Sequence, residues 1–224
     1  MSDGPGPEPD GADARSPESE GSGAGRAEPE LIDAGRADEI GEQKPGQLDS
    51  RPIHDGRVVH LSMDTVRFPD GSTGELELIR HSGAAAVVPV LGDPDGPDPE
   101  IVLLRQFRYA AGGEIYEIPA GRPDRSGEPW EEVARRELEE ETGYVAGRLR
   151  RLNTIYTPPG FTDERIHIFL ATDLSRGTVD LDPDEFVEVV TLPRSHVVAA
   201  IRDGRIIDAK SVSGLLYYAR FASP

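Results

Sequence analysis

The sequence contains no cysteine, which excludes disulfide bonds, thiolate metal sites and cysteine nucleophiles. It also contains no apolar run approaching the roughly 18 residues that a membrane-spanning helix requires. Residues 1–10 lack the basic start and apolar stretch of an export signal. These absences predict a cytoplasmic protein that does not bind a membrane.

Positive charge is scarce, since 24 lysines and arginines face 42 acidic residues, for a formal net charge of -18. Phosphate backbones and anionic lipids are bound mainly through lysine and arginine, so the charge argues against nucleic acid and membrane partners. A small phosphate-containing ligand remains compatible with an acidic protein when a metal ion lies between the two.

The chain has 224 residues, enough for one ordinary domain and a tail. Residues 1–50 are rich in glycine, proline, serine and acidic residues, a composition that predicts a disordered acidic tail. Residues 51–83 predict an N-terminal β-strand subdomain, a hairpin with strands at 58–68 and 75–79. We assign residues 84–224 to the main domain.

Within the main domain, short apolar runs predict strands and longer periodic segments predict helices. Strands and a few helices follow one another without regular alternation, so we expect an α+β fold with helices against a mixed sheet. The expected strands are 84–91, 101–104, 114–118, 166–171 and 186–190, and the expected helices are 129–141, 193–201 and 211–221.

The helix expected at 129–141 carries three glutamates on one face, Glu137, Glu140 and Glu141. Two like charges 4 Å apart repel by about 1 kcal/mol in water and about 4 kcal/mol near a protein surface. A divalent cation reverses this cost, and oxygen ligands favour magnesium or manganese, often together with substrate phosphates. On the spacing alone, however, a solvated charged face is the commoner explanation.

The residues around these glutamates resemble the Nudix box, which reads G, five residues, E, seven residues, then R-E-U-x-E-E-x-G-U, where U is apolar. The matching positions are Gly121, Glu128, Arg136-Glu137-Leu138, Glu140-Glu141, Gly143 and Tyr144. Six residues rather than five separate Gly121 from Glu128, a departure confined to the loop before the helix. So many matches at fixed spacing are far more specific than a single short motif.

Three further segments are similar to the ADP-ribose pyrophosphatase branch of that family: Gln106-Phe107-Arg108, Glu117 to Gly121, and Pro159 to Glu164. The resemblance covers most of the chain from Arg51 onward. It implies a Nudix α/β/α sandwich that hydrolyses the diphosphate bond of ADP-ribose to AMP and ribose 5-phosphate, using two or three Mg²⁺ or Mn²⁺ ions.

The resemblance also implies roles for residues of the box. Glu137 and Glu141 would be the main metal ligands, with Glu140 and the Ala120 carbonyl as further ligands. Arg136 would orient the glutamates. A backbone carbonyl at a strand end is a plausible hard-oxygen ligand.

Outside the box, Glu164 is the expected general base and an additional metal ligand, with its neighbour Asp163 as the rival. Arg108 is expected to bind the diphosphate, because a guanidinium suits phosphate oxygens. Glu117 and, more loosely, Arg80 are further candidates for substrate contacts. The five histidines show no ligand spacing, and none is assigned a site role.

Several alternatives remain open at this level. The substrate could be another nucleoside diphosphate sugar such as GDP-mannose, because the box contacts only the diphosphate. A non-catalytic nucleotide sensor would predict a broken carboxylate set, and a purely structural acidic protein would not explain the box. Relatives of this branch are commonly homodimers whose N-terminal strands reach the partner, a role we assign to residues 58–79.

Overall fold

The computed structural model describes residues 46–181 and 186–222. Most of the expected acidic tail therefore lies outside the described residues. No helix in the described part of the chain is long and apolar enough to cross a membrane.

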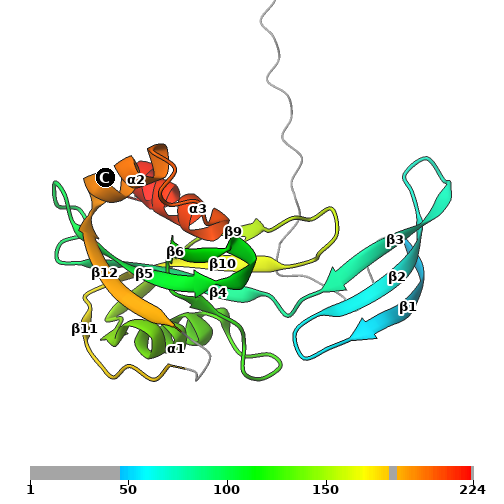
Figure 1. Ribbon diagram of the computed structural model, residues 1–224, viewed down its shortest axis with the longest axis horizontal. Helices are drawn as coiled ribbons and strands as arrows, with labels where there is room; N and C mark the ends of the chain where they lie inside the picture. The colour runs from blue at the N-terminus through cyan, green and yellow to red at the C-terminus, as the bar shows by residue number, and fades with distance from the viewer. Residues whose placement is uncertain (1–45, 182–185, 223–224) are drawn as a thin grey trace, which may run out of the picture. The chain divides into compact units, whose positions relative to one another are not determined.

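The N-terminal part is a three-stranded antiparallel sheet in the order β1-β2-β3 (Figure 1). Strands β2 (His60–Arg67) and β3 (Thr73–Arg80) form the expected hairpin. The first strand, β1 (Gln47–Asp55), was not expected, and it begins inside the segment assigned to the tail. The expected N-terminal β subdomain is confirmed, with one strand more than the hairpin. Strand β1 is polar and almost fully exposed, so it lacks the apolar pattern that predicts a strand.

The main domain is built on a seven-stranded sheet with the path β12-β5-β4-β10-β9, to which β6 adds on β5 and β7 on β4. All neighbours are antiparallel except β4 and β10, which run parallel, so the sheet is mixed as expected. Its strands are β4 (Ala84–Leu91), β5 (Glu100–Arg108), β6 (Gly113–Glu117), β7 (Ala120–Gly121), β9 (Arg148–Tyr156), β10 (Arg165–Thr172) and β12 (Val187–Pro193). Two short strands, β8 (Tyr144–Val145) and β11 (Ser175–Arg176), pair with each other.

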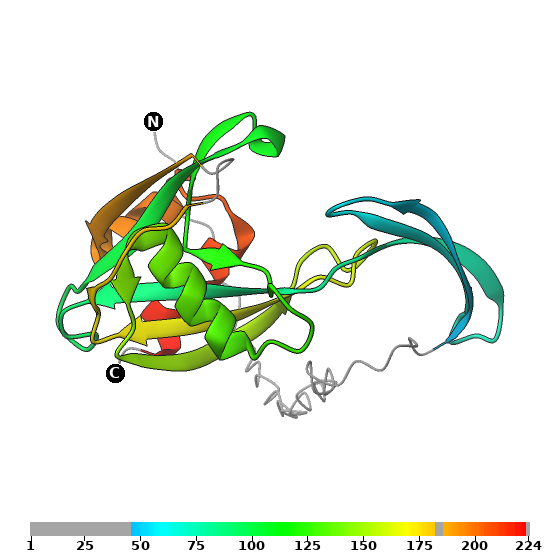
Figure 2. The ribbon, with the colours of Figure 1, turned by 90° about the horizontal axis from the view of Figure 1, so that it is seen from below.

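Helix α1 (Trp130–Thr142) covers one face of this sheet, and α2 (Arg194–Arg202) and α3 (Ala209–Tyr217) cover the other (Figures 1 and 2). The expected α/β/α sandwich with a mixed sheet is confirmed. The last expected helix is divided, because α3 gives way to a π-helical turn at Tyr218–Ala222.

The core lies in two apolar layers, one on each side of the sheet. Strand β4 supplies both, since Val87 faces α1 and its neighbour Val88 faces α2 and α3, and both are fully buried. A central strand buried on both faces requires a continuous apolar run, which is why this segment was evident in the sequence.

Helix α1 is fixed to the sheet by Val133, Ala134 and Leu138, all with no exposed surface. It ends where expected: Gly143 has a φ of 67°, and its N–H donates to the Glu139 carbonyl at 2.7 Å. Glycine takes this left-handed conformation without steric cost. The buried stripe holds the neighbouring glutamate face in place against β7.

Candidate active site

The glutamate face of α1 contacts the short strand β7. The Ala120 N–H donates to Glu141 Oε2 at 2.9 Å. The Glu137 carboxylate lies against Gly121, where an added Cβ would come within 2.0 Å of it. Glu137 and Glu141 therefore both lie beside β7, and only glycine leaves room for Glu137 there.

Arg136 links the glutamates of the helix to one another and to the preceding loop. Its Nη1 donates to Glu137 Oε1 at 2.8 Å and to Glu140 Oε2 at 2.9 Å, and its Nη2 donates to the Arg122 carbonyl at 2.8 Å. Burial lowers the pKa of Arg136, but the charges of Glu137 and Glu140 outweigh it, and the pKa is raised. These are the contacts that an orienting arginine would make.

The loop before α1 is folded around Glu128, which is 7% exposed. Its Oε2 accepts from the Asp124 N–H at 2.8 Å, and its Oε1 lies 3.5 Å from the Arg125 guanidinium. Glu128 also lies 3.8 Å from Arg136 Nε. The extra residue of this loop therefore leaves Glu128 in contact with Arg136.

The α1 glutamates offer the oxygen ligands of a divalent-cation site, but their carboxylates do not converge on a single point. Among the described residues, no three histidine or acidic side chains are grouped to hold a metal ion. Arg136 donates hydrogen bonds to Glu137 and Glu140, and the Ala120 N–H donates one to Glu141. Three carboxylates beside one helix arginine nevertheless fit a hard cation, which would relieve their repulsion.

Arg108 and Glu117, expected to contact substrate separately, form a bidentate ion pair. Arg108 Nε donates to Glu117 Oε1 at 2.8 Å and Nη2 donates to Oε2 at 2.9 Å. Lys210 joins them, with its Nζ 2.5 Å from Glu117 Oε2. Sequence reasoning missed Lys210, because no local pattern relates α3 to β6.

The charges of this group change the pKa values of its members. The hydrogen bond to Glu117 raises the pKa of Arg108, against the effect of burial, and the charge of Glu141 raises it further. Burial would raise the pKa of Glu117, but Arg108 and Lys210 outweigh it and the pKa is lowered. Glu141 accepts from the Ala120 N–H, three residues after Glu117, so the two clusters lie within electrostatic range of each other.

Glu164, the expected general base, lies in the loop between β9 and β10. Its Oε2 accepts from Thr157 Oγ1 at 2.8 Å, and its Oε1 lies 3.4 Å from His81 Nδ1. Among the described residues it makes no hydrogen bond or ion pair to α1. The structure thus places His81, which had been given no role, against Glu164.

Arg80 and Asp163 connect the N-terminal sheet to the loop that carries Glu164. Arg80 Nη2 donates to the buried Asp64 carboxylate, and Nη1 lies 3.6 Å from Asp163 Oδ2. Asp163 Oδ1 accepts from the His81 N–H at 2.8 Å. Arg80 is therefore engaged by two protein carboxylates, and Asp163 supports the loop.

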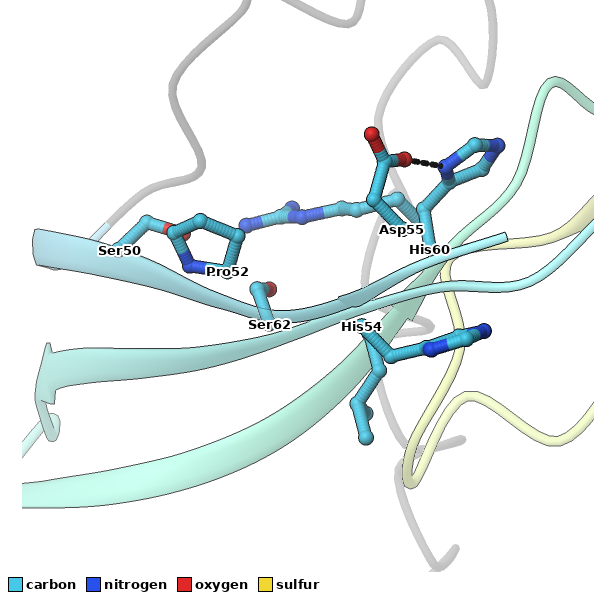
Figure 3. A pocket seen from close by; sticks show the side chains of 8 residues that line it. Ser50, Pro52, His54, Asp55, His60 and Ser62 are labelled. Atoms are coloured by element: carbon cyan, nitrogen blue, oxygen red, sulfur yellow. Dashed lines mark hydrogen bonds and ion pairs between the residues drawn. The ribbon is translucent and has the colours of Figure 1, made fainter. Parts of the chain in front are cut away.

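The N-terminal sheet also bears a cavity of about 160 Å³, separate from the glutamates of α1 (Figure 3). Two of its lining residues, Asp55 and His60, are joined by a hydrogen bond between Asp55 Oδ1 and His60 Nδ1. Its lining consists of Ser50, Pro52, His54, Asp55, His60, Leu61, Ser62 and Arg80.

Comparison with known proteins decides the family. A model of the NUDIX domain matches residues 81–213 of the chain. The chain is also 38% identical over 167 residues to an ADP-ribose pyrophosphatase from Bacillus subtilis (strain 168), covering 74% of this chain and 87% of that protein. The chain belongs to the Nudix family. The Nudix hydrolase expected from the box is thereby confirmed, despite the longer loop.

Other Nudix relatives carry different substrate names. A GDP-mannose pyrophosphatase from Citrobacter koseri (strain ATCC BAA-895 / CDC 4225-83 / SGSC4696) is 40% identical over 129 residues, covering 52% of this chain and 65% of that protein. A crystal structure described as an ADP compounds hydrolase matches with a TM-score of 0.67 at 23% identity, covering 82% of this chain and 96% of that one. At that identity the match shows a shared Nudix fold.

Proposed function

We propose that this Nudix hydrolase cleaves the diphosphate bond of ADP-ribose, releasing AMP and ribose 5-phosphate in a magnesium-dependent reaction. The observation that carries the proposal is the glutamate face of α1 against Ala120 and Gly121, with Arg108 within electrostatic range of Glu141. The similarity to an ADP-ribose pyrophosphatase over most of both chains supports the choice of substrate.

The groups that would hold two or three Mg²⁺ or Mn²⁺ ions are Glu137, Glu140, Glu141 and the Ala120 carbonyl, with Glu164 as a further ligand. Bound ions would neutralise the diphosphate and lower the pKa of water. Arg136 would keep Glu137 and Glu140 in position through the two hydrogen bonds from its Nη1.

Glu164 would act as the general base. Its Oε2 accepts from the Thr157 hydroxyl, and its Oε1, which lies 3.4 Å from His81 Nδ1, would accept a proton from the attacking water. The water oxygen forms a bond to one phosphorus, and the bond from that phosphorus to the bridging oxygen breaks. Arg108 would donate hydrogen bonds to a non-bridging phosphate oxygen and hold the diphosphate in line.

A panel of nucleoside diphosphate sugars, with products separated by chromatography, tests the substrate. We expect ADP-ribose to give the highest kcat/KM, with AMP and ribose 5-phosphate as products. The GDP-mannose relative makes that sugar nucleotide the second candidate. A kcat/KM for GDP-mannose equal to or above that for ADP-ribose would reject the first choice.

Replacing Glu164 by glutamine tests the general base. Positioned acids and bases contribute about 10²- to 10⁴-fold, so we expect kcat to fall by that factor. Magnesium affinity should change far less. Asp163→Asn is the matched control, and an equal or larger loss of kcat in that variant would transfer the role to Asp163.

We also propose a homodimer in which the N-terminal sheet packs against the partner. The sheet exposes Leu48, Ile53 and Leu76, each between 45% and 48% accessible. Apolar side chains gathered on an exposed surface favour burial against another surface. Light scattering should give twice the chain mass of 24.2 kDa, and a single-chain mass would remove the proposal.

A further inference from the structure

Lys210 is a buried cation at the start of α3, on the opposite face of the sheet from α1. The residue is 9% exposed, and its Nζ lies 2.5 Å from Glu117 Oε2 and 3.0 Å from Asp208 Oδ2. A lysine this buried is costly unless it is paired. Both of its partners are carboxylates, so the charge is matched on two sides.

Glu117 transmits this contact to Arg108. Its two oxygens bind Nε and Nη2 of Arg108, which fixes the plane of the guanidinium. The side chain of Arg108 is 43% exposed, and its Nη1 has no hydrogen-bond partner among the described residues. One edge of Arg108 is therefore anchored, and another is left to bind an anion.

The charges of the cluster also depend on Lys210. Arg108 and Lys210 balance Glu117 and Asp208, so the group as a whole is neutral. Without Lys210, the group would carry a net negative charge within range of Glu141. An incoming diphosphate would then meet repulsion where Arg108 should attract it.

A second contact ties the same end of α3 to Ile118, the residue that follows β6. Ser211 Oγ accepts from the Ile118 N–H at 2.8 Å and donates to Asp208 at 2.6 Å. Asp208 in turn caps α3 by accepting from the Ser211 N–H at 3.0 Å. The start of α3 thus holds the segment that leads from Glu117 towards β7.

We propose that Lys210 is a positioning residue, which acts through Glu117 to present the Nη1 edge of Arg108 to the substrate diphosphate. This inference rests on the proposed function. Because Arg108 would contact the diphosphate in both ground state and transition state, its displacement should weaken substrate binding more than it slows the chemical step.

The test compares Lys210→Met with Lys210→Arg in steady-state hydrolysis of ADP-ribose. We expect the methionine variant to raise KM about tenfold, because a loss of this size corresponds to roughly one hydrogen bond to a charged group. Its kcat should stay within about threefold of the wild-type value. The arginine variant should restore most of the KM. Arg202→Met removes an exposed cation of α2 that pairs with Asp203, and it should leave both constants unchanged.

A second readout does not depend on turnover. The ¹⁵Nε–H signal of Arg108, assigned with Arg108→Lys, should be protected from exchange in the wild type and in Lys210→Arg, and lost in Lys210→Met. Wild-type protein that hydrolyses no sugar nucleotide would reject the proposed function, while this signal would still decide the role of Lys210.

The positioning role is overturned by either of two results: an unchanged KM together with an unchanged Arg108 signal in Lys210→Met, or a loss of kcat without a rise in KM. Should Lys210→Met fail to fold, Glu117→Asp decides the question. That variant keeps the charge but is too short to reach both Arg108 and Lys210. It should raise KM similarly, and a wild-type KM would overturn the role.

Discussion

Two charged clusters lie within electrostatic range of each other, and they are built differently. On α1, Glu137 and Glu140 share Arg136, and Glu141 accepts from a backbone N–H. Arg135, the other arginine of the helix, bonds instead to Glu131 and the Ala146 carbonyl. The α1 cluster therefore has more carboxylates than helix cations to match them.

The cluster around Glu117 is balanced, with Arg108 and Lys210 facing Glu117 and Asp208. The difference indicates that the two clusters have different tasks. A surplus of carboxylates costs stability in the metal-free protein and favours uptake of a divalent cation. A balanced group would instead hold one guanidinium, that of Arg108, for the proposed ligand.

The largest effect is expected from Glu141→Gln. Outer residues of a metal site already contribute about 10- to 100-fold to metal affinity or activity, so loss of a direct ligand should lower kcat/KM by more than about 100-fold. Steady-state assays across a magnesium series would measure it. A loss under about threefold would show that the surplus on α1 serves some other purpose.

Glu117→Gln should have its main effect on stability. Removing one partner of a buried ion pair costs about 3–5 kcal/mol, and we expect the lower end because Arg108 is partly exposed. The free energy of unfolding, measured with denaturant, gives the cost. A change below about 1 kcal/mol would contradict the balanced-cluster account.

The same variant should alter the response to acid. The folded-state pKa of Glu117 lies below its usual 4.5, so near that pH the unfolded chain binds more protons than the folded protein. The stabilisation is complete at neutral pH and is lost as the pH falls from about 4.5 through the lower folded-state pKa. In Glu117→Gln the free energy of unfolding should therefore fall less steeply below about pH 4.5. The same pH dependence in the variant and the wild type would contradict this role of Glu117.

Gly121→Ala tests the room left for Glu137. The new Cβ would lie 2.0 Å from the carboxylate, so Glu137 must move. Overpacking of this kind costs about 1–3 kcal/mol, and we expect magnesium affinity to fall about tenfold. Gly113→Ala, where the added Cβ meets nothing within 4 Å, is the control and should leave magnesium binding unchanged. An equal fall in magnesium affinity in both variants would show that Gly121 has no special role in positioning Glu137.

The smallest effect is expected from Glu140→Gln in the metal-free protein. Its ion pair with Arg136 is partly exposed and worth about 0–1 kcal/mol, and the substitution also relieves repulsion from neighbouring carboxylates. The free energy of unfolding should therefore change by less than about 0.5 kcal/mol. A loss above about 2 kcal/mol would mean that the ion pair of Glu140 with Arg136 stabilises the fold as strongly as the pairs around Glu117.

Much of the fold was predictable because its signals are local. The apolar run of β4, the periodic stripe of α1 and the stop at Gly143 each reflect packing or backbone geometry within a few residues. Strand β1 was missed because its side chains are polar and exposed, so only pairing with β2 defines it.

Within the candidate site, contacts were predictable where a motif fixes the spacing, as between Arg136 and the glutamates of α1. They were not predictable where tertiary contacts bring residues together. Lys210 reaches Glu117 across 93 positions of sequence, and His81 reaches Glu164 through the loop that pairs with β3. Charged residues at such distances show no local pattern, because their partners are set by the fold.

The central claim is that divalent ions, brought together with a diphosphate ligand, make the crowding of the α1 glutamates favourable. Titration of Mn²⁺ followed by electron paramagnetic resonance tests it in the wild type and in Glu141→Gln, each with and without ADP-ribose. We expect the wild type to bind Mn²⁺ more tightly in the presence of the nucleotide, and the variant to lose that binding. A wild-type protein that takes up no Mn²⁺ under either condition would contradict the account.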